Sequence, residues 1–346
     1  MNTAILHALA AAALFGASTP LAKALLGDLP PLLLAGLLYL GSGLGLTLAR
    51  LIRDRRWQRS GFTRAEWPWF IGAVFFGGVL GPAALMYGLT STPGATASLL
   101  LNLEAVLTAV LAWVVFRENA DRRIVLGMAA IVAGSVVLSW SGHVDIAAGW
   151  IGPLAVAAAC LCWAIDNNLT RKVSASDALL IAGVKGLVAG GFNTALAFVW
   201  GATFPAGGNV ALAMAVGLFG YGISLVFFVL ALRGLGTART GAYFSTAPFI
   251  GAAVAILFFG ESTSPAFWVA AGLMGLGVWL HLTERHEHDH VHEPMDHTHE
   301  HVHDAHHQHE HDASWDGTEP HAHAHHHPAL QHQHAHFPDI HHRHSH

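Results

Sequence analysis

Long apolar stretches separated by short polar segments fill residues 1–285 of the chain, and a polar, His-rich segment follows them. Stretches of about 20 apolar residues are long enough to cross a bilayer as helices. The first stretch has no basic leading region, and it is longer than the apolar part of a signal peptide, so we expect a retained helix. Ten transmembrane helices are predicted, at residues 3–26, 30–52, 67–90, 93–116, 122–140, 147–170, 178–200, 209–232, 237–259 and 265–283.

The pattern of the chain occurs twice. Residues 92–119 and 236–262 align after a shift of 143 positions, which places Glu118 on Glu261 and Gly134 on Gly277. Each copy contains an apolar helix rich in small residues, a Phe-x-Glu ending and a further apolar helix. Duplicated hydrophobic segments in a membrane chain are typical of secondary transporters. The domains predicted are a first repeat at 1–140, a second repeat at 141–285 and a tail at 286–346.

The positive charges predict how the chain is oriented. Lys and Arg occur in every second loop, and such loops stay on the cytoplasmic side. Both termini are therefore predicted to be cytoplasmic, in a multi-pass protein of the bacterial inner membrane. Because each copy has five spans, an odd number, the second copy must be inverted relative to the first. The basic residues of these loops are Arg50, Arg53, Arg55, Arg56, Arg59 and Arg64, then Arg117, Arg122 and Arg123, then Arg171 and Lys172, and finally Arg233 and Arg239.

Two segments, LLNLEAVLTAVLAWVVFRE and STAPFIGAAVAILFFGES, resemble the two copies of the EamA-type repeat of the drug/metabolite transporter superfamily. The opening AALFGASTPLAKALL is similar to the same family, so the resemblance covers roughly residues 3–283. It implies an exporter of small metabolites with its site between the halves. We therefore predict an all-α integral membrane protein with ten transmembrane helices in two inverted five-helix repeats, plus a disordered His-rich tail.

Polar residues inside the spans are candidates for the transport pathway, because each costs several kcal/mol in hydrocarbon unless it is paired or hydrated. At about 1.5 Å per residue, Glu104 lies about 16 Å into its span, near the midplane. Asp166 and Lys185 lie at similar depth from the cytoplasmic side, so an ion pair between them can form. For both sets, a role in binding and a structural role in holding helices together remain open. The candidate pathway residues are Glu104, Asn102, Asp166, Asn167, Lys185, Tyr243, Ser245 and Thr246.

Other polar features have simpler interpretations. Glu118 and Glu261 end helices, and a helix-end acid that binds backbone amides or Arg is the simpler account. The glycine-rich runs indicate close helix packing. The spans contain no phosphate-binding loop, metalloprotease motif or catalytic triad, so an enzyme is not expected.

The tail differs from the spans in charge and chemistry. It carries 24 of the 27 His and, with His neutral, a net charge of −10, against +5 for residues 1–285. Neutral imidazole is a good ligand for Ni, Zn, Co and Cu. Alternating His without a scaffold predicts many weak, interchangeable sites in a segment that is disordered without metal. The predicted ligands are His286, His288, His290, His292, His297, His299, His301, His303, His306, His307, His309 and His311.

Three functions remain open at this point. The leading hypothesis is a secondary transporter that exports a small solute or metabolite, with a tail that binds divalent metal and no cofactor required. The first alternative is an exporter of a divalent metal or a metal chelate. The second is a metal-sensing or metal-buffering membrane protein without transport, which the duplicated helices disfavour. The partners expected are the lipid bilayer, a small-molecule substrate and divalent metal ions, with no nucleic acid, and a homodimer is left open.

Overall fold

The computed structural model of the chain consists of two units, a helical body at Met1–Glu284 and a tail at Arg285–His346. Several residues that the sequence singled out lie outside the described residues, namely Arg56, Arg59, Arg117, Glu118, Lys172, Arg233, Arg239, His286, His303, His306, His307, His309 and His311. The described residues are 3–55, 63–64, 66–116, 122–140, 150–171, 173, 177–228, 230–231, 240, 243–283, 287–292, 295–301, 321–327 and 330–335.

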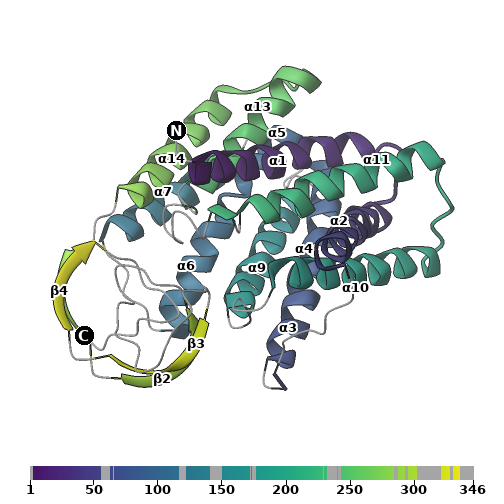
Figure 1. Cartoon of the computed structure of the whole chain (residues 1–346). Helices are drawn as coiled ribbons and strands as arrows, with labels where there is room; N and C mark the ends of the chain where they lie inside the picture. The colour runs from purple at the N-terminus through teal and green to yellow at the C-terminus, as the bar shows by residue number, and fades with distance from the viewer. Residues whose placement is uncertain are drawn as a thin grey trace. The chain divides into compact units, whose positions relative to one another are not determined.

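The helices of the body follow the ten predicted stretches, with ends that differ by a few residues where they are described. Figure 1 shows α7 and α14 at one edge of the helical body and α2 and α10 at the other. The described elements are α1 (Thr3–Leu25), α2 (Pro31–Asp54), α3 (Trp67–Ala73), η1 (Val74–Leu80), α4 (Gly81–Ser91), α5 (Gly94–Leu100), α6 (Leu103–Phe116), α7 (Arg122–Ser139), α9 (Ile151–Arg171), α10 (Ala178–Val199), α11 (Gly207–Gly217), η2 (Leu218–Ile223), α13 (Ala247–Phe259) and α14 (Pro265–Leu282).

Six helical stretches within the described residues are long and apolar enough to cross a membrane. Three shorter apolar helices accompany them, at Val125–Ser139, Ala247–Phe259 and Pro265–Leu280. The helix α9 is long, but its second half contains Asp166, Asn167 and Asn168, which lower its hydropathy. The six full spans are Thr3–Leu25, Pro31–Asp54, Trp67–Ser91, Gly94–Leu111, Leu179–Val199 and Gly207–Phe228.

Four of the predicted spans are interrupted, which the sequence did not predict. The third and eighth contain the π-helical segments η1 and η2, at positions that the repeat shift relates. The fourth and ninth break at residues 101–102 and 245–246, which the same shift relates to within one residue. A span that is apolar on all sides has no periodic pattern that an interruption could disturb. The duplication thus extends to the irregular parts of the fold.

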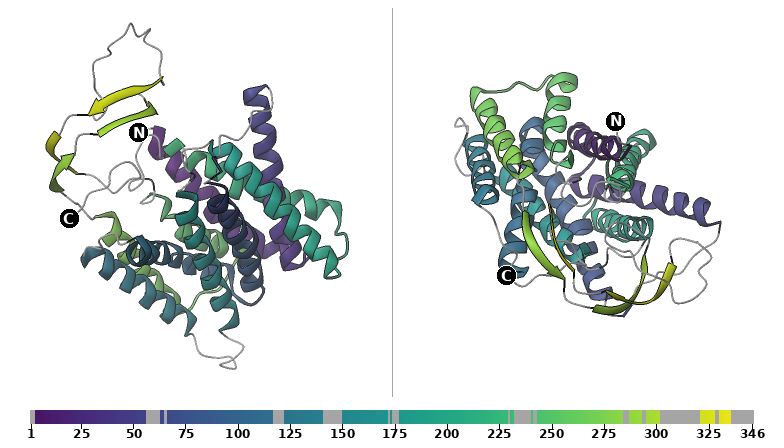
Figure 2. Two further views of the ribbon diagram at one scale, coloured as in Figure 1. Left: turned by 90° about the horizontal axis from the view of Figure 1, so that it is seen from below. Right: turned by 60° about the vertical axis from the view of Figure 1, so that its left-hand side comes forward.

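Equivalent helices of the two copies pack against each other in antiparallel pairs, α2 with α10 and α7 with α14. Between α2 and α10 the close contacts are reciprocal, because Gly36 lies against Thr194 and Gly183 against Thr47. Gly43 and Gly186 meet between them. Small residues let helix backbones approach closely in membrane proteins. Both views in Figure 2 show the body as a bundle of such packed helices.

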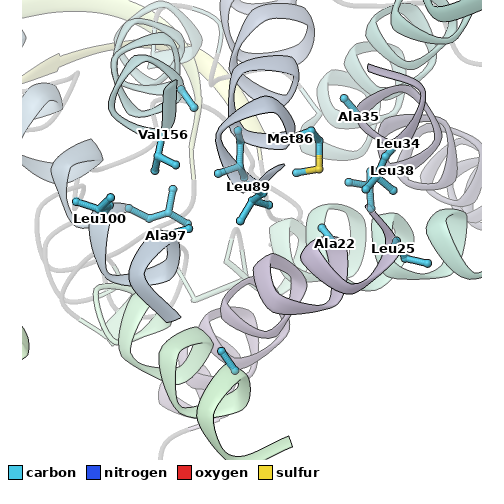
Figure 3. Close-up of a cluster of buried hydrophobic side chains, with 14 of the residues drawn as sticks. Ala22, Leu25, Leu34, Ala35, Leu38, Met86, Leu89, Ala97, Leu100 and Val156 are labelled. Carbon is cyan, nitrogen blue, oxygen red and sulfur yellow. The ribbon is translucent and has the colours of Figure 1, made fainter. Parts of the chain in front are cut away.

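A large apolar cluster fills one end of the body, where α1 and α4 end and α2 and α5 begin. Leu29, Leu33 and Leu89 are at most 2% exposed there. Figure 3 shows Leu25, Leu34, Met86 and Leu89 among the buried side chains of this cluster. Close packing of this kind excludes water. We call this end the leucine end, and its opposite, which carries Arg50 and Asp177, the arginine end.

The described parts of the tail lie in four strands. The strand β1 (Glu287–His292) pairs antiparallel with β4 (Leu330–Ala335), and β2 (Met295–His301) pairs with β3 (His321–His327). Every second residue of the His blocks is a His, and two residues is the period of a strand. Two-stranded ribbons of this kind are only marginally stable in water.

Candidate functional site

The segment η1 is held by side chains from three other helices. Tyr39 of α2 and Trp163 of α9 both donate to the Gly77 carbonyl, at 2.8 and 3.1 Å. Asn193 of α10 donates to the Val79 carbonyl at 3.2 Å. A π-helical turn shifts the ladder of backbone hydrogen bonds, and such turns occur frequently at functional sites. These donors fix η1 against α2, α9 and α10.

The Asp166 carboxylate lies directly against η1. A side chain on Gly77 would overlap this carboxylate, so only glycine fits at that position. The carboxylate forms an ion pair with Lys185 and accepts a hydrogen bond of 2.9 Å from the Thr170 hydroxyl. The Asp166 and Lys185 side chains are 9% and 15% exposed. Charges this deep in a membrane protein persist when they are paired, and they are typical of substrate or ion pathways.

Glu104 approaches the same region from α6. Asn167 of α9 donates to the Glu104 carboxylate at 2.9 Å and contacts the Thr108 hydroxyl at 3.4 Å. Glu104 lies in the first turn of α6, directly after the break in the fourth span. The amino end of a helix favours a negative charge. Glu104 also interacts electrostatically with both Asp166 and Lys185, so all three charged groups belong to one cluster.

Aromatic rings from both copies adjoin this region through Tyr39 and Trp163, which bind the Gly77 carbonyl. Phe15 of α1 contacts Trp163, Tyr221 and Phe244, with ring centroids 6.4, 5.8 and 5.4 Å away. Tyr221 of η2 also contacts Tyr39, at 5.5 Å. Phe15, Tyr221 and Phe244 are partly exposed, although they lie between helices. We call these five residues the aromatic cluster.

The other predicted pathway residues lie elsewhere. Asn102 is 3% exposed and donates to the Leu99 carbonyl at 2.9 Å, so it caps α5 at the break. Tyr243, Ser245 and Thr246 surround the equivalent break before α13, where the Thr246 hydroxyl donates to the Tyr243 carbonyl at 2.6 Å. All three are partly buried. The structure therefore joins Glu104 with Asn167 and Asp166 with Lys185, and it places the remaining four residues at the two helix breaks.

The Phe-x-Glu ending has a structural explanation in the second copy. Gly260 ends α13 in the left-handed conformation, with φ of 65°. The chain then turns so that the Glu261 carboxylate accepts hydrogen bonds from the Gly94 and Ala95 amides, at 2.8 and 2.7 Å. This carboxylate satisfies the free amides at the start of α5. Nearby, the Lys23 ammonium donates to the Leu89 carbonyl. Both contacts join helices at the leucine end.

The sequence did not single out Tyr39, Trp163 and Asn193, because one aromatic or amide residue in an apolar span has no pattern that distinguishes binding from packing. The Gly77-Gly78 pair was the signal available in the sequence for these contacts. Two adjacent glycines let neighbouring helices approach the backbone closely. Among the described residues, no group of three or more His, Cys, Asp or Glu side chains is placed to hold a metal ion. Six of the predicted tail ligands, His288, His290, His292, His297, His299 and His301, lie in β1 and β2.

One solved crystal structure has the same fold over most of the chain. It superposes with a TM-score of 0.60 and covers 80% of this chain and 95% of that chain. The two sequences are 21% identical. At this identity the likeness shows the fold and says nothing about the solute.

Sequence relatives point to transport. An uncharacterized transporter of Methanothermobacter thermautotrophicus is 25% identical over 290 residues, which are 77% of this chain and 82% of that protein. The uncharacterized transporter YvbV of Bacillus subtilis is 27% identical over 162 residues, which are 46% of this chain and 50% of that protein. The EamA-like transporter family matches twice, at residues 2–140 and 150–283, which are the two copies. The chain is therefore a multi-pass membrane protein that belongs to the EamA-like transporter family.

Proposed function

We propose that this protein is a secondary active transporter that exports a small solute across the bacterial inner membrane, with both termini in the cytoplasm. One observation carries the proposal, namely that Glu104–Asn167 and Asp166–Lys185 meet beside an interrupted span. Transporters bind their solutes near the midplane, at discontinuous helices between repeats. The antiparallel pairing of equivalent helices supports inverted repeats, since a pseudo-two-fold axis in the membrane plane relates such helices.

The two ends of the body support alternating access. At the leucine end the side chains are buried and Glu261 bonds the start of α5. Toward the arginine end, Asn167 is exposed and Glu104 is only partly buried. In the predicted orientation the leucine end is periplasmic, so this conformation faces inward. Export then requires the Glu261 contact to open after the solute has bound.

We further propose that the tail binds divalent metal weakly and regulates or supplies the transporter. Strand register supports this idea, because His297, His299 and His301 pair with His325, His323 and His321. His residues directly opposite each other on a ribbon have Cβ atoms about 4.5–5.5 Å apart, close enough to share a cation. Export of the metal itself is the alternative, and no specific contact in the helical body favours it over a small solute.

Inside-out vesicles test both the transport and the role of the tail. Glu66 precedes α3 and accepts hydrogen bonds from the Thr63 amide and hydroxyl, so Glu66→Gln is the control. Vesicles that contain the wild type, Glu104→Gln or Glu66→Gln are energised and incubated with a defined mixture of small metabolites and NiCl2. Mass spectrometry then measures what each vesicle accumulates. We expect one solute to accumulate with the wild type and the Glu66→Gln control, and at least about tenfold less with Glu104→Gln, because the cluster loses a charge.

The same assay with residues 286–346 removed separates the roles of the tail. If solute accumulation persists but loses its response to NiCl2, the tail is regulatory. Accumulation of nickel instead of any metabolite would establish the alternative. If no species accumulates above vesicles without the protein, export is wrong.

A further inference from the structure

We propose that the solute is a monovalent organic cation with an aromatic or apolar body, an amine held between Glu104 and the aromatic cluster. This inference rests on the proposed transport function and names the chemical class of the solute. It follows from two independent features of the site, its charge balance and its aromatic rings. Neither feature depends on the tail.

With all three groups ionised, the charge balance of the cluster is negative. The described charges that interact there are two carboxylates, Glu104 and Asp166, and one ammonium, Lys185. Lys185 is committed to Asp166 by their ion pair, and Thr170 occupies the second carboxylate oxygen. Glu104 receives one neutral hydrogen bond, from Asn167. A single positive charge on the solute completes the cluster, because an unpaired carboxylate at this depth is costly.

The aromatic cluster suits the body and the charge of such a solute. A cation is attracted to the face of an aromatic ring within about 6 Å of its centroid. Phe15, Tyr221 and Phe244 are partly exposed. The centroid of the Phe15 ring lies 5.8 Å from that of Tyr221 and 5.4 Å from that of Phe244. Tyr39 and Trp163 connect these rings to the charges, because both donate to Gly77, against which Asp166 lies.

Other solute classes fit the site less well. An anion would have to take Lys185 away from Asp166 and would face Glu104 as a like charge. A divalent metal ion needs several oxygen, nitrogen or sulfur ligands, and the described residues provide no group of three acidic, His or Cys side chains at one point. A neutral solute would leave Glu104 without a counter-charge. The remaining class, a monocation with a hydrophobic body, uses both the carboxylate and the rings.

Matched probes test the charge and the ring separately. The full-length protein in lipid nanodiscs is titrated at pH 7 with 2-phenylethylammonium, 2-phenylethanol and 3-phenylpropionate, which share a ring and differ in charge. A fourth probe, n-butylammonium, keeps the charge and lacks the ring. Calorimetry gives the dissociation constants. We expect 2-phenylethylammonium to bind at least about tenfold more tightly than each of the other three.

Variants then assign the preference to the residues named. Glu104→Gln should remove the tenfold advantage of 2-phenylethylammonium over 2-phenylethanol, and Tyr221→Leu should reduce its advantage over n-butylammonium. Glu66→Gln, remote from the site, should change neither. Should Glu104→Gln fail to fold by circular dichroism, the wild-type probe series and Tyr221→Leu still decide. Tighter or equal binding of the neutral or anionic probe to the wild type would overturn the proposal, as would an unchanged cation preference in a folded Glu104→Gln.

This outcome is independent of the vesicle assay. Selective binding of the cation without accumulation of any solute in vesicles would keep the site and overturn transport. Accumulation of a neutral or anionic solute, with no selective binding of 2-phenylethylammonium, would keep transport and overturn the cation.

Discussion

The segments η1 and η2 occupy equivalent positions in the two copies, and their surroundings differ. Beside η1, Gly77 lies against the Asp166 carboxylate, and polar side chains bind the backbone. Beside η2, Gly220 lies against Ser18, and Tyr221 contributes its ring to the aromatic cluster. The duplication has therefore kept the position of the helix interruption and changed its chemistry. The segment η1 lies against a charged group, and η2 contributes an aromatic ring.

The broken spans show the same division. In the fourth span, Glu104 follows the break, and in the ninth, Ala247 and Pro248 occupy that place. The start of α6 therefore holds a charge, whereas the start of α13 is apolar with a proline at a position that needs no backbone donor. The two helix breaks are thus related in position and different in charge.

The largest expected effect comes from adding a methyl group to η1. Gly77→Ala would push the Asp166 carboxylate away from Lys185, and we expect it to abolish transport and to cost about 1–3 kcal/mol of stability. Gly220→Ala, the counterpart in η2, meets the Ser18 side chain and should cost similar stability while transport persists in part. Gly272→Ala is the control, because nothing lies within 4 Å of its added methyl group. Solute accumulation and thermal melting of each variant measure the two effects.

Equal loss of transport in the Gly77→Ala and Gly220→Ala variants, at equal melting temperature, would contradict the difference in chemistry that we infer between η1 and η2. The chemistry of η1 would then be no more important than the architecture that both segments share.

A smaller effect is expected from the ion pair beside η1. Removal of one partner from a buried pair leaves an uncompensated charge and costs about 3–5 kcal/mol, less where water reaches the group. We expect Asp166→Asn and Lys185→Met to lower the melting temperature individually, and the double variant to regain much of the loss. Transport should stay impaired in the double variant, since stability returns without the charges. If the double variant transports at the wild-type rate, the pair only locks α9 to α10.

The sequence predicted the parts of the fold that depend on hydrophobic length and repetition. The ten helical stretches, the duplication and the approach of Asp166 to Lys185 follow from apolar runs, from repeat alignment and from depth along a span. Glu261 was predicted to bind backbone at a helix end, and it does so at Gly94 and Ala95. That partner is 166–167 residues away in the chain, and only the folded structure identifies it.

The interruptions and the aromatic cluster could not be predicted, for a common physical reason. Within an apolar span, an aromatic residue looks the same whether it faces lipid, a neighbouring helix or a solute. Asn102, which was predicted as a pathway residue in a continuous span, lies instead in the break. Its side-chain amide and its backbone amide both donate to the Leu99 carbonyl at the end of α5.

The smallest effect is expected where neither π-helical segment is involved, at the arginine end of the α2–α10 pair. Asp177 precedes α10, accepts a hydrogen bond from the Leu179 amide at 3.0 Å and pairs with Arg50 at 3.2 Å and with Arg53. Burial alone would raise the pKa of Asp177, but hydrogen bonds from Arg53 and the Leu179 amide outweigh it and lower the pKa. A carboxyl group with a lowered pKa stabilises the folded state fully above its ordinary pKa of about 3.9, and the contribution disappears as the pH falls through the lowered value.

Asp177→Asn keeps a side chain that caps helices well and removes the charge, so we expect a loss of about 1 kcal/mol or less at pH 7. Transport should be unchanged, because the described contacts of Asp177 are with Arg50, Arg53 and the Leu179 amide and not with η1 or η2. Melting temperatures of the wild type and the variant should differ equally at pH 7 and pH 5 and converge below about pH 4. A difference that persists at low pH would show that the charge of Asp177 is not the cause. If Asp177→Asn instead lost transport at full stability, the arginine end would belong to the moving part of the transporter. The difference between η1 and η2 would then not be enough to explain function.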